Sequence, residues 1–127
     1  MYHCDVPCGI YKIEPARTAA ETIVRMIELI EELPKDNPTA NDRNKFVRCV
    51  LTKEKHAKKC KKELLILWTD YFKPEHLTKF PDLHDIFWKA AKLCSKNKQE
   101  INMDAAKELL RTVDKIGEIF TKTKTSK

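Results

Sequence analysis

The first nine residues of the chain bring together three side chains that can bind a transition metal. His3, Cys4 and Cys8 supply one imidazole and two thiols, and Pro7 and Gly9 favour a turn around them. Donors of this kind bind copper, nickel and zinc. A C-x3-C spacing alone is a moderate signal, so an incidental pair of cysteines that forms a disulfide on oxidation is the alternative.

The residues that follow are expected to form the helices that position this hook. Apolar side chains recur at helical spacing in four segments. These segments cover residues 14–33, 42–68, 83–94 and 102–120. In the second segment the spacing is interrupted only by Lys53, and Asn41 and Asn102 are expected N-caps. The pattern predicts an all-α fold, an up-down-up-down four-helix bundle with an N-terminal metal-binding hook.

The domain organisation follows from the same pattern. The chain has 127 residues, which is the size of one domain. We expect the hook at residues 1–13, the bundle at residues 14–122 and a frayed tail at residues 123–127.

Composition excludes several classes of protein. Only two glycines are present, which argues against nucleotide-binding and all-β folds. No apolar run reaches the length of a membrane span, and no signal-peptide segment precedes the hook, so we expect a cytoplasmic protein without membrane contact. The net charge is +6, but the lysine-rich stretch 53–62 is typical of a solvated helix face, and we expect no nucleic-acid partner.

Three stretches of the sequence carry a resemblance to a known family. HCDVPCGIY at residues 3–11, LWTDYFKPEH at 67–76 and FPDLH at 80–84 resemble the nickel superoxide dismutases, and a weaker similarity extends through residues 114–116. The resemblance implies a right-handed four-helix bundle, usually assembled as a homohexamer. It also implies an enzyme that disproportionates superoxide to dioxygen and hydrogen peroxide.

The resemblance also implies roles for individual residues. It makes His3, Cys4 and Cys8 metal ligands, with His3 counted among the catalytic residues. Tyr11, the second catalytic residue, orders superoxide or water near the metal. The residues that wall or support the substrate pocket are Asp5, Pro7, Tyr11 and Tyr71.

Three departures from the family bear on the metal. Met1 and Tyr2 precede His3, whose free amine binds nickel in the family, and we expect Met1 to stay because Tyr2 is bulky. Ala19 stands where the resemblance places a glutamate that holds the axial histidine. His56 stands where it places the arginine that holds this glutamate.

These departures favour copper over nickel. A small Ala19 leaves room for His56 to reach His3, which gives two imidazoles beside two thiolates. Two histidines and a cysteine form the donor set of copper electron-transfer sites, and copper has the highest affinity in the divalent series. We therefore expect one copper ion per chain, with nickel as the alternative. In a rival arrangement, the first three residues form an amino-terminal copper or nickel trap without thiolates.

The remaining cysteines allow a non-catalytic interpretation. Cys4, Cys8, His56 and Cys60 could form a structural zinc site, so the alternative function is a helical protein that binds zinc or copper without turnover. Cys49, Cys60 and Cys94 are more simply explained as small core residues. We expect a superoxide dismutase whose only small-molecule partner is superoxide and which forms a homo-oligomer.

Overall fold

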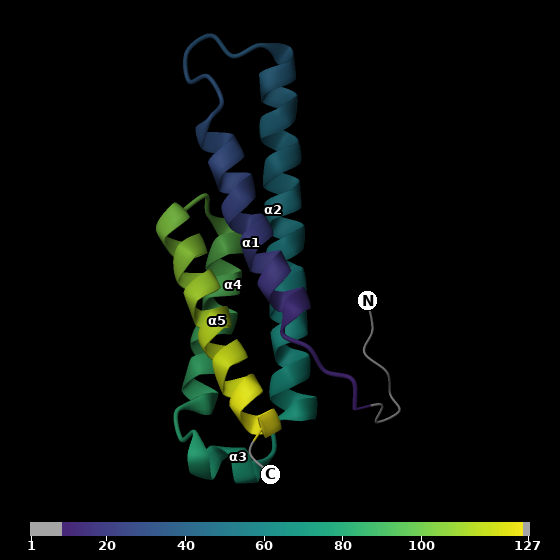
Figure 1. The fold of residues 1–127 in the computed structure, drawn as a ribbon. Coiled ribbons are helices and arrows are strands. Elements are labelled where there is room, and N and C mark those ends of the chain that lie inside the picture. The colour runs from purple at the N-terminus through teal and green to yellow at the C-terminus, as the bar shows by residue number, and fades with distance from the viewer. Residues whose placement is uncertain (1–8, 126–127) are drawn as a thin grey trace.

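Helices make up most of residues 9–125, which are the residues that the computed structural model describes (Figure 1). The elements follow one another along the chain. They are α1 (Glu14–Glu31), α2 (Ala40–Ile66), the π-helical turn η1 (Leu67–Tyr71), α3 (Pro74–Lys79), α4 (Leu83–Gln99) and α5 (Met103–Thr125).

Four long helices enclose one apolar core. α1 packs against α2 and α5, and α4 packs against the same two helices from the other side. The predicted all-α four-helix bundle is therefore confirmed. The apolar stripes explain it, because the stripe residues of α4 and α5, including Phe87 and Val113, are buried in this core.

The N-terminal part of α2 departs from the predicted stripe. Phe46 falls on the helical apolar spacing of the segment 42–68 and would be expected to be buried. However, 42% of its surface is exposed, and Val47 and Leu51 are exposed as well. Figure 1 shows the reason: the α1–α2 pair extends well beyond the ends of α4 and α5. α2 contributes to the apolar core cluster only further along, where Ala57, Cys60 and Leu64 are buried.

Capping explains where two of the helices begin. The N-cap of α2 is Thr39 and not the expected Asn41, because Thr39 and Asp42 form a reciprocal capping box. The expected cap Asn102 is confirmed, since its Oδ1 accepts a hydrogen bond from the backbone N–H of Ala105 at 3.0 Å.

Two features near the end of α2 and at the C-terminus were not expected. The predicted break between residues 70 and 81 contains the short helix α3. α5 continues to Thr125, so it includes residues 123–125 of the expected frayed tail. No helix in the described part of the chain is both long and apolar enough to cross a membrane. A cytoplasmic location stays a prediction.

Candidate functional site

The described chain begins at Gly9, directly after Cys8, the last predicted ligand in the hook. Gly9 adopts a φ of 72°, in the left-handed region that glycine enters without steric cost. Residues 10–12 then lead into α1, and Tyr11 is half-buried among them. Gly9 therefore turns the chain directly between Cys8, the last predicted ligand in the hook, and Tyr11.

Tyr11 contacts Tyr71, the other tyrosine assigned to the substrate pocket. Their ring centroids lie 5.5 Å apart, and the rings are inclined by 59°. Tyr71 ends the π-helical turn η1, in which the N–H of Phe72 donates to the carbonyl of Leu67 at 3.0 Å. Such turns often mark functional positions because they change the direction of a side chain relative to a regular helix. The structure thus brings Tyr11 and Tyr71 together. Their roles at a substrate pocket stay a prediction.

The direction of the Tyr71 hydroxyl is fixed by α5. The hydroxyl oxygens of Tyr71 and Thr123 lie 2.7 Å apart. Thr123 Oγ1 also donates to the carbonyl of Phe120 at 2.6 Å. Because a threonine hydroxyl has one proton, Tyr71 must donate to Thr123. The Tyr71 oxygen therefore keeps its acceptor capacity for another group.

The Tyr71 ring is also held on its faces. His76 stacks on it with a centroid distance of 5.9 Å, and Phe120 contacts it edge-on at 4.7 Å. The Nδ1 atom of His76 accepts a hydrogen bond from the backbone N–H of Lys73 at 3.0 Å, so its role is structural. Contacts from α3 and α5 leave Tyr71 little freedom to rotate.

The segment that carries Tyr11 is fastened to α5. Lys124 Nζ donates to the carbonyl of Tyr11 at 3.3 Å. Ile13 packs against Gly117, where an added Cβ would lie 3.3 Å from its Cγ1. One turn into α1, Arg17 Nε is 2.7 Å from a carboxylate oxygen of Asp114. The carboxylates of Asp114 and Glu21 raise the pKa of Arg17, and the hydrogen bond with Asp114 is the largest cause.

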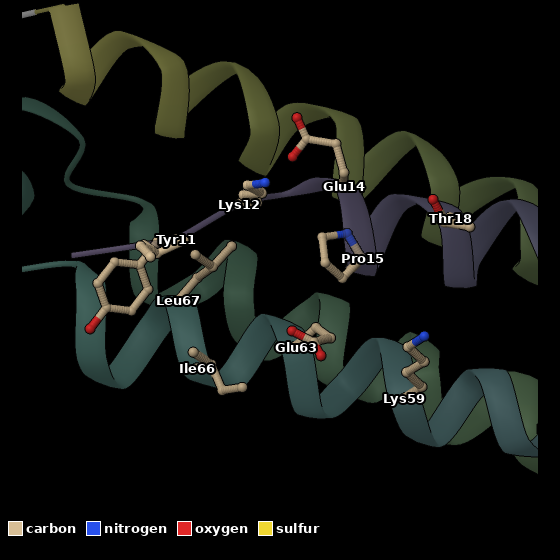
Figure 2. A pocket seen from close by; sticks show the side chains of 10 residues that line it. Tyr11, Lys12, Glu14, Pro15, Thr18, Lys59, Glu63, Ile66 and Leu67 are labelled. Carbon is tan, nitrogen blue, oxygen red and sulfur yellow. The ribbon is translucent and has the colours of Figure 1, made fainter. Parts of the chain in front are cut away.

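Two hollows adjoin Tyr11. One, of about 520 Å³, lies between the start of α1 and the last turns of α2, and Figure 2 shows Tyr11 near one end and Lys59 and Thr18 near the other. The second, of about 410 Å³, is lined by Gly9, Tyr11, Tyr71 and the charged side chains that follow Tyr71. Tyr11 stands between them, at the point where the chain leaves the hook.

His56 lies apart from both hollows. It is half-buried on α2, one turn before Lys59, and does not line either cavity. Its Nδ1 lies 2.9 Å from the carbonyl oxygen of Thr52 and must donate to it, since a carbonyl can only accept. Nε2 then carries the free lone pair, which is the arrangement usual in metal-bound histidines.

Ala19 has a packing role that the metal argument did not consider. Its side chain is 1% exposed and belongs to the core together with Ala16 and Ala20. Small residues at these positions let α1 approach its neighbours closely, and a glutamate at position 19 would bury a carboxylate there. Alanine at this position therefore has an explanation that is independent of the metal.

The remaining predicted site residues fall outside the described range. They are His3, Cys4, Asp5, Pro7 and Cys8. Within residues 9–125, no three His, Cys, Asp or Glu side chains are grouped to hold a metal ion. Sequence reasoning missed Thr123 and Lys124 because they follow the last predicted helix. If the last helix had been predicted to continue through residues 121–125, both residues would have been placed on it.

Comparison with known proteins supplies the context for this site. The model of the family described as nickel-containing superoxide dismutase matches residues 1–124. The chain belongs to this family. A superoxide dismutase [Ni] of Streptomyces seoulensis is 35% identical over 96% of this chain and 88% of that protein. The corresponding protein of Streptomyces coelicolor is 33% identical over the same shares.

Solved structures of the family agree with the fold. The native structure of a nickel superoxide dismutase has a TM-score of 0.87 and 31% identity, and the match covers 98% of this chain and 100% of that one. A structure titled with nickel ligation of the oxidised state has the same TM-score and 32% identity. The family and the names of these relatives support nickel, and none of these relatives supports the expectation of copper.

Proposed function

We propose that this protein is a superoxide dismutase that uses nickel bound through His3, Cys4 and Cys8. The observation that carries the proposal is the family match over residues 1–124, which includes both the hook and the bundle. Two thiolates and an imidazole are donors that suit nickel. When bound, the metal supplies the one-electron couple that superoxide disproportionation requires.

The chain's own residues prepare the site for a small anion. Tyr11, at the exit of the hook, orders superoxide or water by hydrogen bonding with its hydroxyl. Tyr71 supports the Tyr11 ring at 5.5 Å, and the hydrogen bond with Thr123 fixes the Tyr71 hydroxyl. Asp5 and Pro7 complete the pocket wall in this proposal.

Positive charge supports capture of the substrate. The net charge of the chain is +6. The two hollows beside Tyr11 carry both lysines and carboxylates, so the attraction comes from the overall charge of the chain and not from their linings. Opposite charge raises the rate at which an anion reaches a site, and salt screens this effect. The rate of superoxide consumption should therefore fall as ionic strength rises.

His56 is the finer part of the ligand proposal. Its support is the free Nε2, since Nδ1 is occupied by the carbonyl of Thr52 at 2.9 Å. In this role it replaces a donor that is lost if Met1 and Tyr2 stay on the chain and block the amine of His3.

We further propose that the protein works as a homo-oligomer, with the hexamer of the family as the expected form. The support is the α1–α2 pair, which extends beyond the rest of the bundle and leaves Phe46, Val47 and Leu51 exposed (Figure 1). The molar mass in solution, measured by light scattering on a sizing column, tests this. A monomer at micromolar concentration would contradict it.

The decisive experiment measures metal content, intact mass and turnover on the same sample. The full chain is expressed with nickel and copper both supplied, then purified without chelator. We expect about one nickel per chain, as the hook offers one donor set, and catalytic consumption of superoxide. Copper alone in an active protein would contradict the nickel proposal, while zinc alone without turnover would overturn the enzyme proposal. The intact mass reports whether Met1 and Tyr2 are present.

A matched pair of variants assigns the metal to the hook. Cys8→Ser should lose both nickel and activity, because it removes a thiolate ligand. Cys49→Ser is the control, since Cys49 is a buried thiol on α2, far along the chain from the hook. Equal metal content in both variants would contradict ligation by Cys8.

A further inference from the structure

Two thiols meet in the core between α2 and α4. Cys60 is 0% exposed and Cys94 is 1% exposed, and both belong to the apolar core cluster. The next residue on each helix confirms the register, because Lys61 Nζ donates to Ser95 Oγ at 3.3 Å. Cys60 and Cys94 therefore face each other across one helix contact.

The two thiols differ in their surroundings. A hydrogen bond with Cys94 and burial raise the pKa of Cys60, the hydrogen bond being the larger cause. Cys60 therefore keeps its proton and can donate its S–H to the sulfur of Cys94. Cys49, the third buried cysteine within residues 9–125, lies outside the apolar core cluster that contains Cys60 and Cys94.

The Cys94 side chain is only 1% exposed, but a hollow of about 370 Å³ between α2 and α4 adjoins it. The other lining residues are Ala57, Lys58, Lys61, Ser95, Lys98 and Gln99, which include three lysines and no carboxylate. Reactive cysteines are found where lysine side chains are close and an oxidant has access, and this hollow provides both. The hollow is large enough for hydrogen peroxide.

We propose that Cys60 and Cys94 form a peroxide-oxidised thiol pair that closes to a disulfide between α2 and α4. The oxidant is hydrogen peroxide, which the proposed dismutase activity produces, so the source of the oxidant rests on the proposed function. The chemistry of the pair does not depend on that activity.

The reaction is balanced as two successive steps. The Cys94 sulfur attacks one oxygen of hydrogen peroxide, the O–O bond breaks, and the leaving hydroxide takes a proton to become water. This gives a sulfenic acid on Cys94. The Cys60 sulfur then attacks the Cys94 sulfur, an S–S bond forms, and the hydroxyl leaves as water with the proton of Cys60. Two thiols are oxidised and one peroxide is reduced to two waters.

The disulfide would join α2 and α4, which are separated in sequence by the segment that contains η1 and α3. Closing such a loop restricts the unfolded chain, so the oxidised protein should resist denaturation better than the reduced one. The pair would thus stiffen the bundle when the product of the reaction accumulates.

The test adds hydrogen peroxide to the full chain, so it is independent of dismutase activity. After graded exposure the protein is unfolded, free thiols are alkylated, and peptides are mapped without reduction. We expect a cross-linked peptide pair containing Cys60 and Cys94, while Cys49 stays alkylated. Cys4 and Cys8 lie on peptides separate from those of Cys60 and Cys94, so oxidation of the hook is scored independently.

Variants sharpen the result. In Cys94→Ala, Cys60 should remain a free thiol, whereas Cys49→Ala should leave the cross-link unchanged. Replacing Lys58 and Lys98 together by glutamine should slow cross-linking at least threefold. Full alkylation of Cys60 and Cys94 in the wild-type protein, at a peroxide dose that oxidises the hook cysteines, would overturn the proposal. Equal cross-linking of Cys60 to Cys49 and Cys94 would overturn it as well.

Discussion

Lys53 is a buried lysine that holds the C-terminal end of α4, and replacing it tests how the bundle is joined. Its side chain is 1% exposed, although it lies in the apolar seam of α2. Its Nζ lies 2.5 Å from the carbonyl oxygen of Asn97, 3.2 Å from that of Lys98 and 2.9 Å from that of Glu100. These carbonyls have no partner within the helix, and the negative end of the helix dipole favours a cation.

The magnitude follows from these three hydrogen bonds. In Lys53→Met, the carbonyls of Lys98 and Glu100 can turn to water because both residues are exposed. The carbonyl of Asn97 cannot, because Asn97 is fully buried, and an unsatisfied buried acceptor costs about 1–3 kcal/mol. Burial lowers the pKa of Lys53, so relief from desolvation offsets part of the loss. Each lost hydrogen bond adds about 1 kcal/mol to this penalty, and the relief from desolvation is subtracted from the sum. We therefore expect the free energy of unfolding to fall by about 2–4 kcal/mol.

Urea unfolding followed by circular dichroism measures this change. Methionine keeps the length and apolar stem of lysine, so packing is largely preserved. Lys55→Met is the matched control, because Lys55 is exposed on the same helix and should change stability by less than about 0.5 kcal/mol. If the two variants unfolded at the same urea concentration, the capping role of Lys53 would be refuted.

Three further predictions concern the site and the helix ends. Thr123→Val should lower the rate constant for superoxide consumption about fivefold, because it removes a hydrogen bond to Tyr71 worth about 1 kcal/mol. Thr123→Ser keeps the hydroxyl and should restore the rate constant. Equal rate constants for the two variants would contradict this role. Hydrogen bonds from the backbone and side chain of Thr39 lower the pKa of Asp42, so its stabilising effect is present above the ordinary value of 3.8 and lost as pH falls through the lower folded value. The wild type should therefore be more stable than Asp42→Asn above pH 3.8, and this difference should shrink as the pH falls through the folded pKa of Asp42. Thermal unfolding of both proteins at several pH values measures the difference. His56→Ala should weaken nickel affinity about tenfold in a competition titration, and unchanged affinity would exclude His56 as a ligand.

The bundle could be predicted from the sequence because burial repeats with the helical period. Ile23 and Ile27 on α1, and Val113 and Ile116 on α5, are buried as their spacing indicated. The short helix α3 could not be predicted in this way, since its six residues include none that is buried and leave no apolar stripe.

The sequence was less informative about polar side chains whose role depends on hydrogen bonds with a distant part of the chain. Lys53 reads as an interruption of the seam, because its type gives no hint of the carbonyls of α4 that it caps. Thr123 reads as part of a polar tail, yet its hydroxyl determines which way Tyr71 donates. In both residues the function depends on atoms from a distant segment, and a residue type alone does not specify that contact.

The metal preference shows the same difficulty at a single position. The expectation of copper treated Ala19 as a lost partner of the hook histidine, and so as a sign of a changed ligand set. In the structure Ala19 is 1% exposed and packs with Ala16 and Ala20, so close helix packing accounts for alanine there. Once Ala19 is explained by packing, His56 is the remaining argument for a different donor set. Its Nε2 is free, but it lines neither hollow beside Tyr11. The balance of these observations favours nickel, with the ligand role of His56 decided by its own variant.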